Sequence, residues 1–254
     1  MARFDLSDFE WALICPLLPN KSRGVARVDD RRVLNGIFRV PRTGSPWRDL
    51  PERYGPCTTV YNRFNRWARA GVWVQVFEAL AEKSPDSMQF IDSPIIRAHQ
   101  HAASGKKGRR SRIGRSRGGL STKINAMVDH RGLPVVITLS PGQGSDKAAV
   151  AGLLAAHPAP GEVVADRGYD ARAILELIAA RGGRGHIPTQ RDRKAQRSVD
   201  PAIYRQRNLV ERFFNKLKHF RKVDTRYEKS AQNYLAAVLI VCSHLWARYY
   251  ESAS

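Results

Sequence analysis

The spacing of apolar and polar residues changes character near residue 85. Before that point apolar residues recur every three or four positions, which is typical of amphipathic helices. Four helices are expected there, over about 8–18, 31–40, 60–71 and 72–82. Ser7 and Glu10 have the spacing of a capping box that would begin the first helix, and Pro41 would end the second. The pattern therefore predicts a small all-α domain over residues 1–85.

After Ser87 the apolar residues come in short runs separated by polar turns, which is typical of strands alternating with helices. The expected order is three strands, a helix, a strand, a helix, a strand and a long helix. This order predicts an α/β layer fold with a mixed sheet. Asp146 and Asp170 are expected to cap the two intervening helices. A last helix over 230–250 would pack back onto this core and complete a domain of residues 86–254.

The long helix is expected to run from Asp200 to Phe220, since Asp200 can cap it and Pro201 suits its first position. Its apolar residues share one broad face. Four polar residues form a narrow stripe along the edge of that face: Tyr204, Arg207, Glu211 and Lys218. An amphipathic helix with a solvated flank explains any one of them. Together, an acid, two cations and a phenol favour a site for metal-bound phosphate.

The charge balance predicts a polyanionic partner. Lys and Arg outnumber Asp and Glu by 43 to 23, which gives a formal net charge of +20. Nucleic acid is the commonest such partner. A membrane surface is the alternative, but the sequence has no lipid-anchor motif and no apolar run of about 18 residues, so no membrane partner is expected. Three scattered cysteines without CxxC spacing argue against a zinc module and fit a reducing cytoplasm.

Two groups of cations are candidate DNA contacts. On the third helix Arg63 and Arg66 lie beside aromatic residues, which suits a helix-turn-helix type DNA reader; a helical lid or dimer surface is the alternative. Between Lys106 and Arg117 the chain has seven Lys or Arg and no acid. The residues of this loop expected to bind phosphates are Lys107, Arg109, Arg110 and Arg112.

Three acids occupy positions that suit a metal site. Asp92 lies in an apolar strand, where a carboxylate is costly unless it is paired or metal-bound. Asp166 ends a strand, and ligand sites in α/β sheets gather at the carboxyl ends of strands. Glu211 lies on the long helix, where a salt bridge with Arg207 is the simpler interpretation. Hard oxygen ligands in a basic chain are what Mg²⁺ requires when it binds phosphate.

The segment from Tyr204 to Lys218 fits the pattern Y-(2)-R-(3)-E-(6)-K. This pattern is a signature of bacterial insertion-sequence transposases of the DDE type. The segments GSPWRDLPERYGP, IDS, ADRGYD and RNLVERFFNKLKHFRK also resemble insertion-sequence family five. The resemblance implies a ribonuclease-H-like catalytic domain preceded by a helix-turn-helix-like DNA-binding domain. It implies an acidic triad of Asp92, Asp166 and Glu211, with Tyr204, Arg207 and Lys218 at supporting DNA-contacting positions.

The same resemblance implies Mg²⁺-dependent strand cleavage and strand transfer, with two ions in the site and Mn²⁺ as a substitute. The expected partners are double-stranded DNA, at terminal inverted repeats and at a target, and further copies in a homodimer or higher oligomer. The expected location is the cytoplasm, on the nucleoid. A catalytically inactive copy acting as a DNA-binding repressor and a nuclease of the same fold are the alternatives. Pro94, two residues after Asp92, is unexpected because proline cannot donate to a strand ladder.

Overall fold

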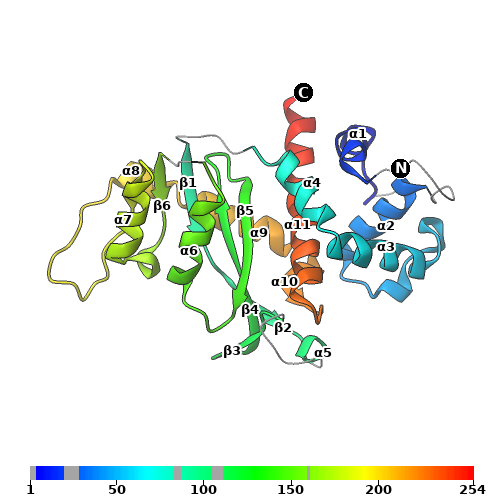
Figure 1. Cartoon of the computed structure of the whole chain (residues 1–254), viewed down its shortest axis with the longest axis horizontal. Helices are drawn as coiled ribbons and strands as arrows, with labels where there is room; N and C mark the ends of the chain where they lie inside the picture. Colours follow the sequence, from blue (N-terminus) through cyan, green and yellow to red (C-terminus); the bar gives the residue numbers. More distant parts are fainter. Residues whose placement is uncertain (1–3, 20–28, 83–86, 104–110, 159–160) are drawn as a thin grey trace. The chain divides into compact units, whose positions relative to one another are not determined.

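The chain divides into two units in the computed structural model (Figure 1). The structure describes residues 4–19, 29–82, 87–103, 111–158 and 161–254. One unit, here called the helical unit, comprises residues 1–81, 99–111 and 217–254; the other, the sheet unit, comprises 82–98 and 112–216. This division differs from the expected one, in which all of residues 86–254 formed the second domain.

The helical unit is built around its C-terminal helix. Its main helices are α1 (Asp8–Ile14), α2 (Asp30–Thr43), α3 (Cys57–Arg69), α4 (Val72–Leu80) and α11 (Ala231–Ala253). Helix α11 packs against all four of the others. Its side chains from Ala236 to Ser243 are buried without interruption, and a helix that is apolar on most sides must be covered by neighbours. Among the described residues, no helix has the length and apolar character needed to cross a membrane.

The ends of the first two helices test the capping signals in the sequence. The Ser7–Glu10 capping box is confirmed: Ser7 Oγ accepts from the Glu10 N–H at 3.0 Å, and Glu10 Oε2 accepts from the Ser7 N–H at 2.9 Å. The expectation that Pro41 ends the second helix is wrong, because Pro41 lies inside the last turn of α2. The helix ends instead at Thr43 and is capped by Gly44, whose φ of 72° is the left-handed conformation that glycine adopts readily.

The sheet unit contains a mixed sheet. Its strands are β1 (Met88–Asp92), β2 (Ile95–Ala98), β3 (Gly114–Ser116), β4 (Gly119–Val128), β5 (Pro134–Pro141), β6 (Glu162–Val164) and β7 (Arg184–His186). They follow the order β7-β6-β1-β4-β2, with β3 and β5 also paired to β4. Strand β1 is parallel to β6 and antiparallel to β4, and β6 is parallel to β7. The predicted α/β class with a mixed sheet is confirmed, although the structure has two more short strands, β2 and β3, before α6 than the sequence predicted.

Helices lie on both faces of this sheet. They are α6 (Asp146–Ala155), α7 (Arg172–Ala180), α8 (Pro201–Arg205) and α9 (Asn208–Lys218). In Figure 1 α6 and α7 lie in front of the strands and α9 lies behind them. Helix α6 packs on β4 and β5, and α7 packs on β7. Helices therefore cover both faces of the central strands, which explains why the sequences of these strands are continuous apolar runs.

Pro94 is accommodated at a break between two strands. Strands β1 and β2 both pair with β4, with Asp92 opposite Ala126 and Ile95 opposite Lys123. Pro94 lies between them, and its carbonyl accepts from the Ile124 N–H at 3.3 Å. The missing proline N–H therefore falls outside both ladders.

The expectation of a single helix from Asp200 to Phe220 is wrong. Asp200 does cap a helix, accepting from the Ala202 N–H at 2.8 Å, but that helix is the short α8. A turn at Gln206 and Arg207 separates it from α9. The N–H groups of Gln206, Arg207 and Leu209 all bond to carbonyls three residues back, which is the pattern of a tight turn. Tyr204 and Glu211 therefore do not share the straight stripe that the sequence suggested.

Candidate active site

Two of the three candidate acids lie side by side at the carboxyl ends of adjacent parallel strands. The register between β1 and β6 pairs Phe90 with Val164. Asp92 and Asp166 each follow two residues later, and Asp166 is in extended backbone. Because side chains alternate along a strand, residues two apart from a register pair point to the same side of the sheet. The strand pairing thus brings these two carboxylates together, as strand-end positions in a parallel sheet predict.

The charge environment of Asp92 agrees with this arrangement. Burial is the largest influence and raises the pKa of Asp92 above its ordinary value. The Ser93 N–H, 2.8 Å from Asp92 Oδ1, lowers the pKa, while the nearby charge of Asp166 raises it again. The charge of Arg207 lowers it and that of Asp146 raises it. A half-buried carboxylate with a second carboxylate beside it is a place where a cation would be stabilised.

Glu211, the third candidate acid, is paired with an arginine in the structure. Its side chain is 50% exposed and forms a salt bridge with Arg207, as the simpler interpretation of the sequence expected. Arg207 therefore acts on Glu211 by contact and on Asp92 by its charge. Within the described ranges, no group of three or more His, Cys, Asp or Glu side chains is arranged to hold a metal ion. The close convergence of all three acids that the sequence predicts is thus not seen in this arrangement.

A buried tyrosine connects the two acid-bearing segments. The Tyr169 hydroxyl donates to Ser93 Oγ at 2.8 Å, and both side chains are buried. Ser93 directly follows Asp92, and Tyr169 lies three residues after Asp166. Burial raises the pKa of Tyr169 well above its ordinary value, and the charges of Asp92, Asp146 and Asp166 raise it further. Sequence reasoning did not single out this bond, because a local pattern cannot show which hydroxyls meet across strands.

A fourth acid near Asp92 is neutralised by a lysine from the sheet. Asp146 was expected to cap α6, but it is the first residue of that helix and Ser145 takes the cap position. Its Oδ1 is 2.5 Å from Nζ of the buried Lys123, which also donates to the Gly144 carbonyl at 2.8 Å. This ion pair holds the start of α6 on β4. Nothing in the sequence pattern identified the pair.

Asp170 was expected to cap α7, and this expectation is wrong because Ala171 takes that position. The Asp170 side chain is buried and points to the basic loop that follows β7. It accepts from the Gln190 N–H at 3.0 Å and lies 2.8 Å from Arg193 Nε. Arg197 contacts the same carboxylate at 3.4 Å. Asp170 therefore anchors this loop a few residues after Asp166.

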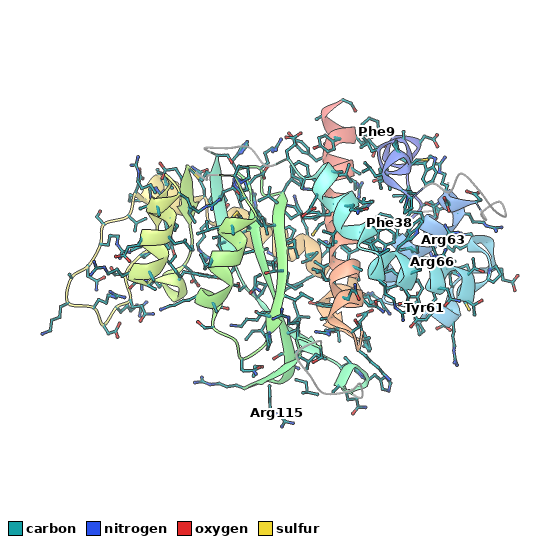
Figure 2. All side chains as sticks on the ribbon, in the orientation of Figure 1. Phe9, Phe38, Tyr61, Arg63, Arg66 and Arg115 are labelled. Atoms are coloured by element: carbon teal, nitrogen blue, oxygen red, sulfur yellow. The ribbon has the colours of Figure 1, made fainter. Side chains whose placement is uncertain are left out.

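The two arginines proposed for DNA recognition on α3 have different environments (Figure 2). Arg63 is only 5% exposed, forms a salt bridge with Asp30 and lies over the Trp67 ring. Contrary to expectation, its charge is used within the helical unit and is not available to DNA in this structure. Arg66, three residues further along the same helix, is exposed. The neighbouring Tyr61 is also exposed.

The basic loop is described only in part. Lys107, Arg109 and Arg110 lie outside the described residues. Arg112 is exposed, and the β3–β4 hairpin that follows carries two further exposed arginines, Arg115 and Arg117. Arg115 is labelled at the lower edge of the view in Figure 2.

The two remaining candidates for DNA contact lie on separate helices. Tyr204 on α8 is half-buried, and Lys218 at the end of α9 is exposed. Lys218 therefore presents its charge to solvent two turns after Glu211.

Comparison with protein families gives two matches that together span most of the chain. A family described as "Putative transposase of IS4/5 family" matches residues 6–77. A second, described as "Transposase DDE domain", matches residues 83–246. The second match covers more than half of the chain and includes Asp92, Asp166 and Glu211.

Three curated proteins are similar to parts of the chain. A "Putative transposase for insertion sequence element IS6501" from Brucella ovis is 33% identical over 51% of this chain and 100% of its own length. An "Uncharacterized protein y4sN" from Sinorhizobium fredii is 36% identical over 45% of this chain and 94% of its own length. An "Insertion element IS402 uncharacterized 16.2 kDa protein" from Burkholderia cepacia is 39% identical over 39% of this chain and 76% of its own length.

Among solved structures, the piggyBac transposase synaptic complex with hairpin DNA matches with a TM-score of 0.47 and 9% identity. The match covers 98% of this chain and 74% of that chain.

Proposed function

This chain belongs to the transposases with a DDE domain, and from that premise we propose that it cuts and rejoins DNA strands at the terminal inverted repeats of an insertion sequence. The observation that carries the proposal is the Asp92–Asp166 pair at the ends of adjacent parallel strands. Two carboxylates held this close in a strongly basic chain suit a divalent cation that in turn binds phosphate oxygens.

The donor set fits Mg²⁺, the ion that the family generally implies, with Mn²⁺ as a substitute. The raised pKa of Asp92 reflects burial beside a second acid, a condition that a bound cation would relieve. Asp92 and Asp166 would hold the metal, and Glu211 would complete the set after release from Arg207. A pair of such ions, when bound, would activate the attacking water or hydroxyl and stabilise the leaving oxygen. Arg207, freed from Glu211, would then contact a DNA phosphate.

The chain's own residues prepare the site in three ways. The β1–β6 pairing places the two aspartates. The Tyr169–Ser93 bond connects the segments that carry them. The Lys123–Asp146 pair offsets the charge of an acid that would otherwise add to the repulsion around Asp92. Double-stranded DNA would be bound by Arg66, Arg112, Tyr204 and Lys218 together with the Lys107–Arg110 segment. Assembly into a homodimer or higher oligomer on DNA completes the proposal.

The test is a cleavage and strand-transfer assay on DNA that carries the ends of the element, with and without Mg²⁺, beside a gel-shift assay on the same DNA. Metal-dependent cleavage followed by joining to a target duplex is the expected result. Cleavage without joining would favour the nuclease alternative, and binding without cleavage would favour the repressor.

Removal of the tyrosine bond should reduce catalysis without reducing DNA affinity. In Tyr169→Phe the ring stays buried but the bond to Ser93 is lost, so the two aspartates are held less rigidly. We expect the single-turnover cleavage rate at saturating DNA to fall by about tenfold, since small misplacements of reacting groups are costly. The Mg²⁺ concentration for half-maximal cleavage should rise as well.

Tyr54→Phe is the matched control for this variant. The buried Tyr54 donates to Asp5 at 2.7 Å within the helical unit, so its loss should cost a similar free energy of unfolding, about 1 kcal/mol. Its cleavage rate and its Mg²⁺ requirement should not change. Equal cleavage defects in the two variants would mean that the Tyr169 bond serves stability alone.

The hairpin arginines should contribute to affinity for any duplex, whatever its sequence. Each phosphate contact adds about 0.9 to the steepness with which log affinity falls against log salt concentration. In the double variant Arg115→Gln, Arg117→Gln this slope should fall by up to about 2 units, as measured by fluorescence anisotropy on random duplexes. Arg172→Gln removes the same charge from an exposed arginine that is already paired with Glu176, and its slope should match the parent's. An unchanged slope in the double variant would exclude the hairpin from the DNA interface.

A further inference from the structure

The helical unit contains a cavity of about 800 Å³ whose lining is rich in aromatic rings. The lining comes from four separate segments of that unit, and its principal residues are Trp47, Arg48, Tyr61, His99, Lys222 and Tyr227. No acid lines it within the described part of the chain. A volume of this size is typical of sites for small ligands.

One wall of the cavity is held by the core of the unit. The Trp47 ring lies 5.5 Å from the Tyr61 ring and 5.1 Å from the Phe64 ring, measured between centroids. Phe64 is buried on α3 and therefore fixes the position of Trp47. The Tyr61 ring, by contrast, is 41% exposed. This wall thus offers aromatic surface on a rigid support.

A second wall is formed by His99 and Tyr227. Their rings stack at 4.8 Å with an interplanar angle of 27°. The His99 N–H donates to the carbonyl of the buried Arg226 at 2.9 Å, which anchors the backbone beneath the stack. Tyr227 is nevertheless 42% exposed. Among the described residues, Tyr61 and Tyr227 are two of four exposed large hydrophobic side chains, and both line this cavity.

A lysine lies between the two walls. Lys222 Nζ is 5.9 Å from the centroid of the Trp47 ring and 6.0 Å from that of Tyr227. Its side chain is largely buried and lies 3.7 Å from Glu228 Oε1. The exposed Arg48 adds a second positive charge to the lining. The cavity therefore combines flat aromatic faces with cations, which is the chemistry that binds single nucleotides of a nucleic acid.

We propose that this aromatic cavity holds an unpaired nucleotide of the DNA that the protein acts on. The base would stack on the exposed ring of Tyr227 or Tyr61, and its phosphate would face Arg48 and Lys222. Stacking is open to every base, because each has a π face, so the cavity would recognise an unpaired nucleotide without selecting a sequence. The inference rests on the proposed function, since its ligand is DNA.

The experiment uses the full chain in EDTA, which prevents cleavage. The probe is a duplex carrying a single bulged 2-aminopurine, compared with the same duplex fully paired. We expect the bulged duplex to bind about tenfold more tightly and its 2-aminopurine fluorescence to be quenched on binding, because one base–aromatic stack gives a difference of this size. Tyr227→Leu should lose the preference and the quenching while keeping its affinity for the paired duplex. Tyr227→Phe, which keeps the ring, should retain both.

The outcomes separate this inference from the proposed function. If the parent binds and cleaves paired DNA but shows no preference for the bulge, the inference is overturned and the proposed function stands. If Tyr227→Leu and the double variant Tyr61→Leu, Tyr227→Leu keep the preference, the unpaired base lies elsewhere. Competition by free deoxyadenosine monophosphate without any preference for the bulge would assign the cavity to free nucleotides instead. If the parent binds no DNA at all, both proposals fail.

Discussion

Replacement of Asp92 by asparagine is expected to reduce Mg²⁺-supported strand cleavage by at least about a hundredfold while leaving duplex binding intact or stronger. The amide keeps the shape of the side chain but removes the charge that would hold the metal. Binding rests on the basic surface, and a carboxylate in the site repels phosphate until a cation is present. Asp166→Asn should have the same effect, because the two carboxylates lie together.

Glu211→Gln should also abolish cleavage, because Glu211 would join the metal ligands when DNA binds. Glu211 is paired with Arg207 here, and it forms no metal-holding group with the two aspartates among the described residues. If it joins the metal only on DNA binding, its loss should cost as much as that of Asp92, and the double variant Asp92→Asn, Glu211→Gln should be no worse than either single change. Substantial cleavage by Glu211→Gln would remove it from the catalytic set.

Glu176→Gln is the matched control for the acids. Glu176 is an exposed acid of the same unit that pairs with Arg172 on the surface of α7. Its amide variant should cleave and bind as the parent does. The assay is single-turnover cleavage of end-containing DNA in Mg²⁺, with gel-shift titration of each variant on the same duplex.

Trp246→Ala is expected to lower the free energy of unfolding by about 3–5 kcal/mol. Trp246 is fully buried on α11 and stacks on Tyr250 at 5.7 Å. Because α11 packs against α1, α2, α3 and α4, the cavity left behind should loosen the N-terminal helices. Urea unfolding followed by circular dichroism measures the loss, and hydrogen exchange locates it.

The location of the loss distinguishes the two ways of dividing the chain. Amide protection should fall in α1 and α4 and persist in β1, β4 and β6, because α11 belongs to the helical unit. A loss of protection in the strands with the N-terminal helices unchanged would restore the division at residue 85. Ser252→Ala, an exposed position near the end of the same helix, should change neither stability nor protection.

Much of the fold could be predicted from the sequence because its signals are local. The capping box at Ser7 and the cap at Asp200 depend on residues within one turn, and both are formed. The β4–β5 hairpin consists of two of the short apolar runs separated by a polar turn at Gly132, whose φ is 76°. The sequence could predict that Asp92 and Asp166 lie close together, because the carboxyl ends of parallel strands meet at one edge of a sheet.

Other features were decided by contacts between residues far apart in the chain. The sequence alone determined the helix and strand periods, the basic charge, the family signature and the strand-end acids. Only the tertiary structure decided that α11 packs with the N-terminal helices and that Arg63 is buried against Asp30. It also joined Tyr169 to Ser93 and turned the chain at Arg207, which left Glu211 in a salt bridge. The reason is physical: periodicity shows which face of an element is apolar, but the partner that covers this face depends on the packing of the whole chain.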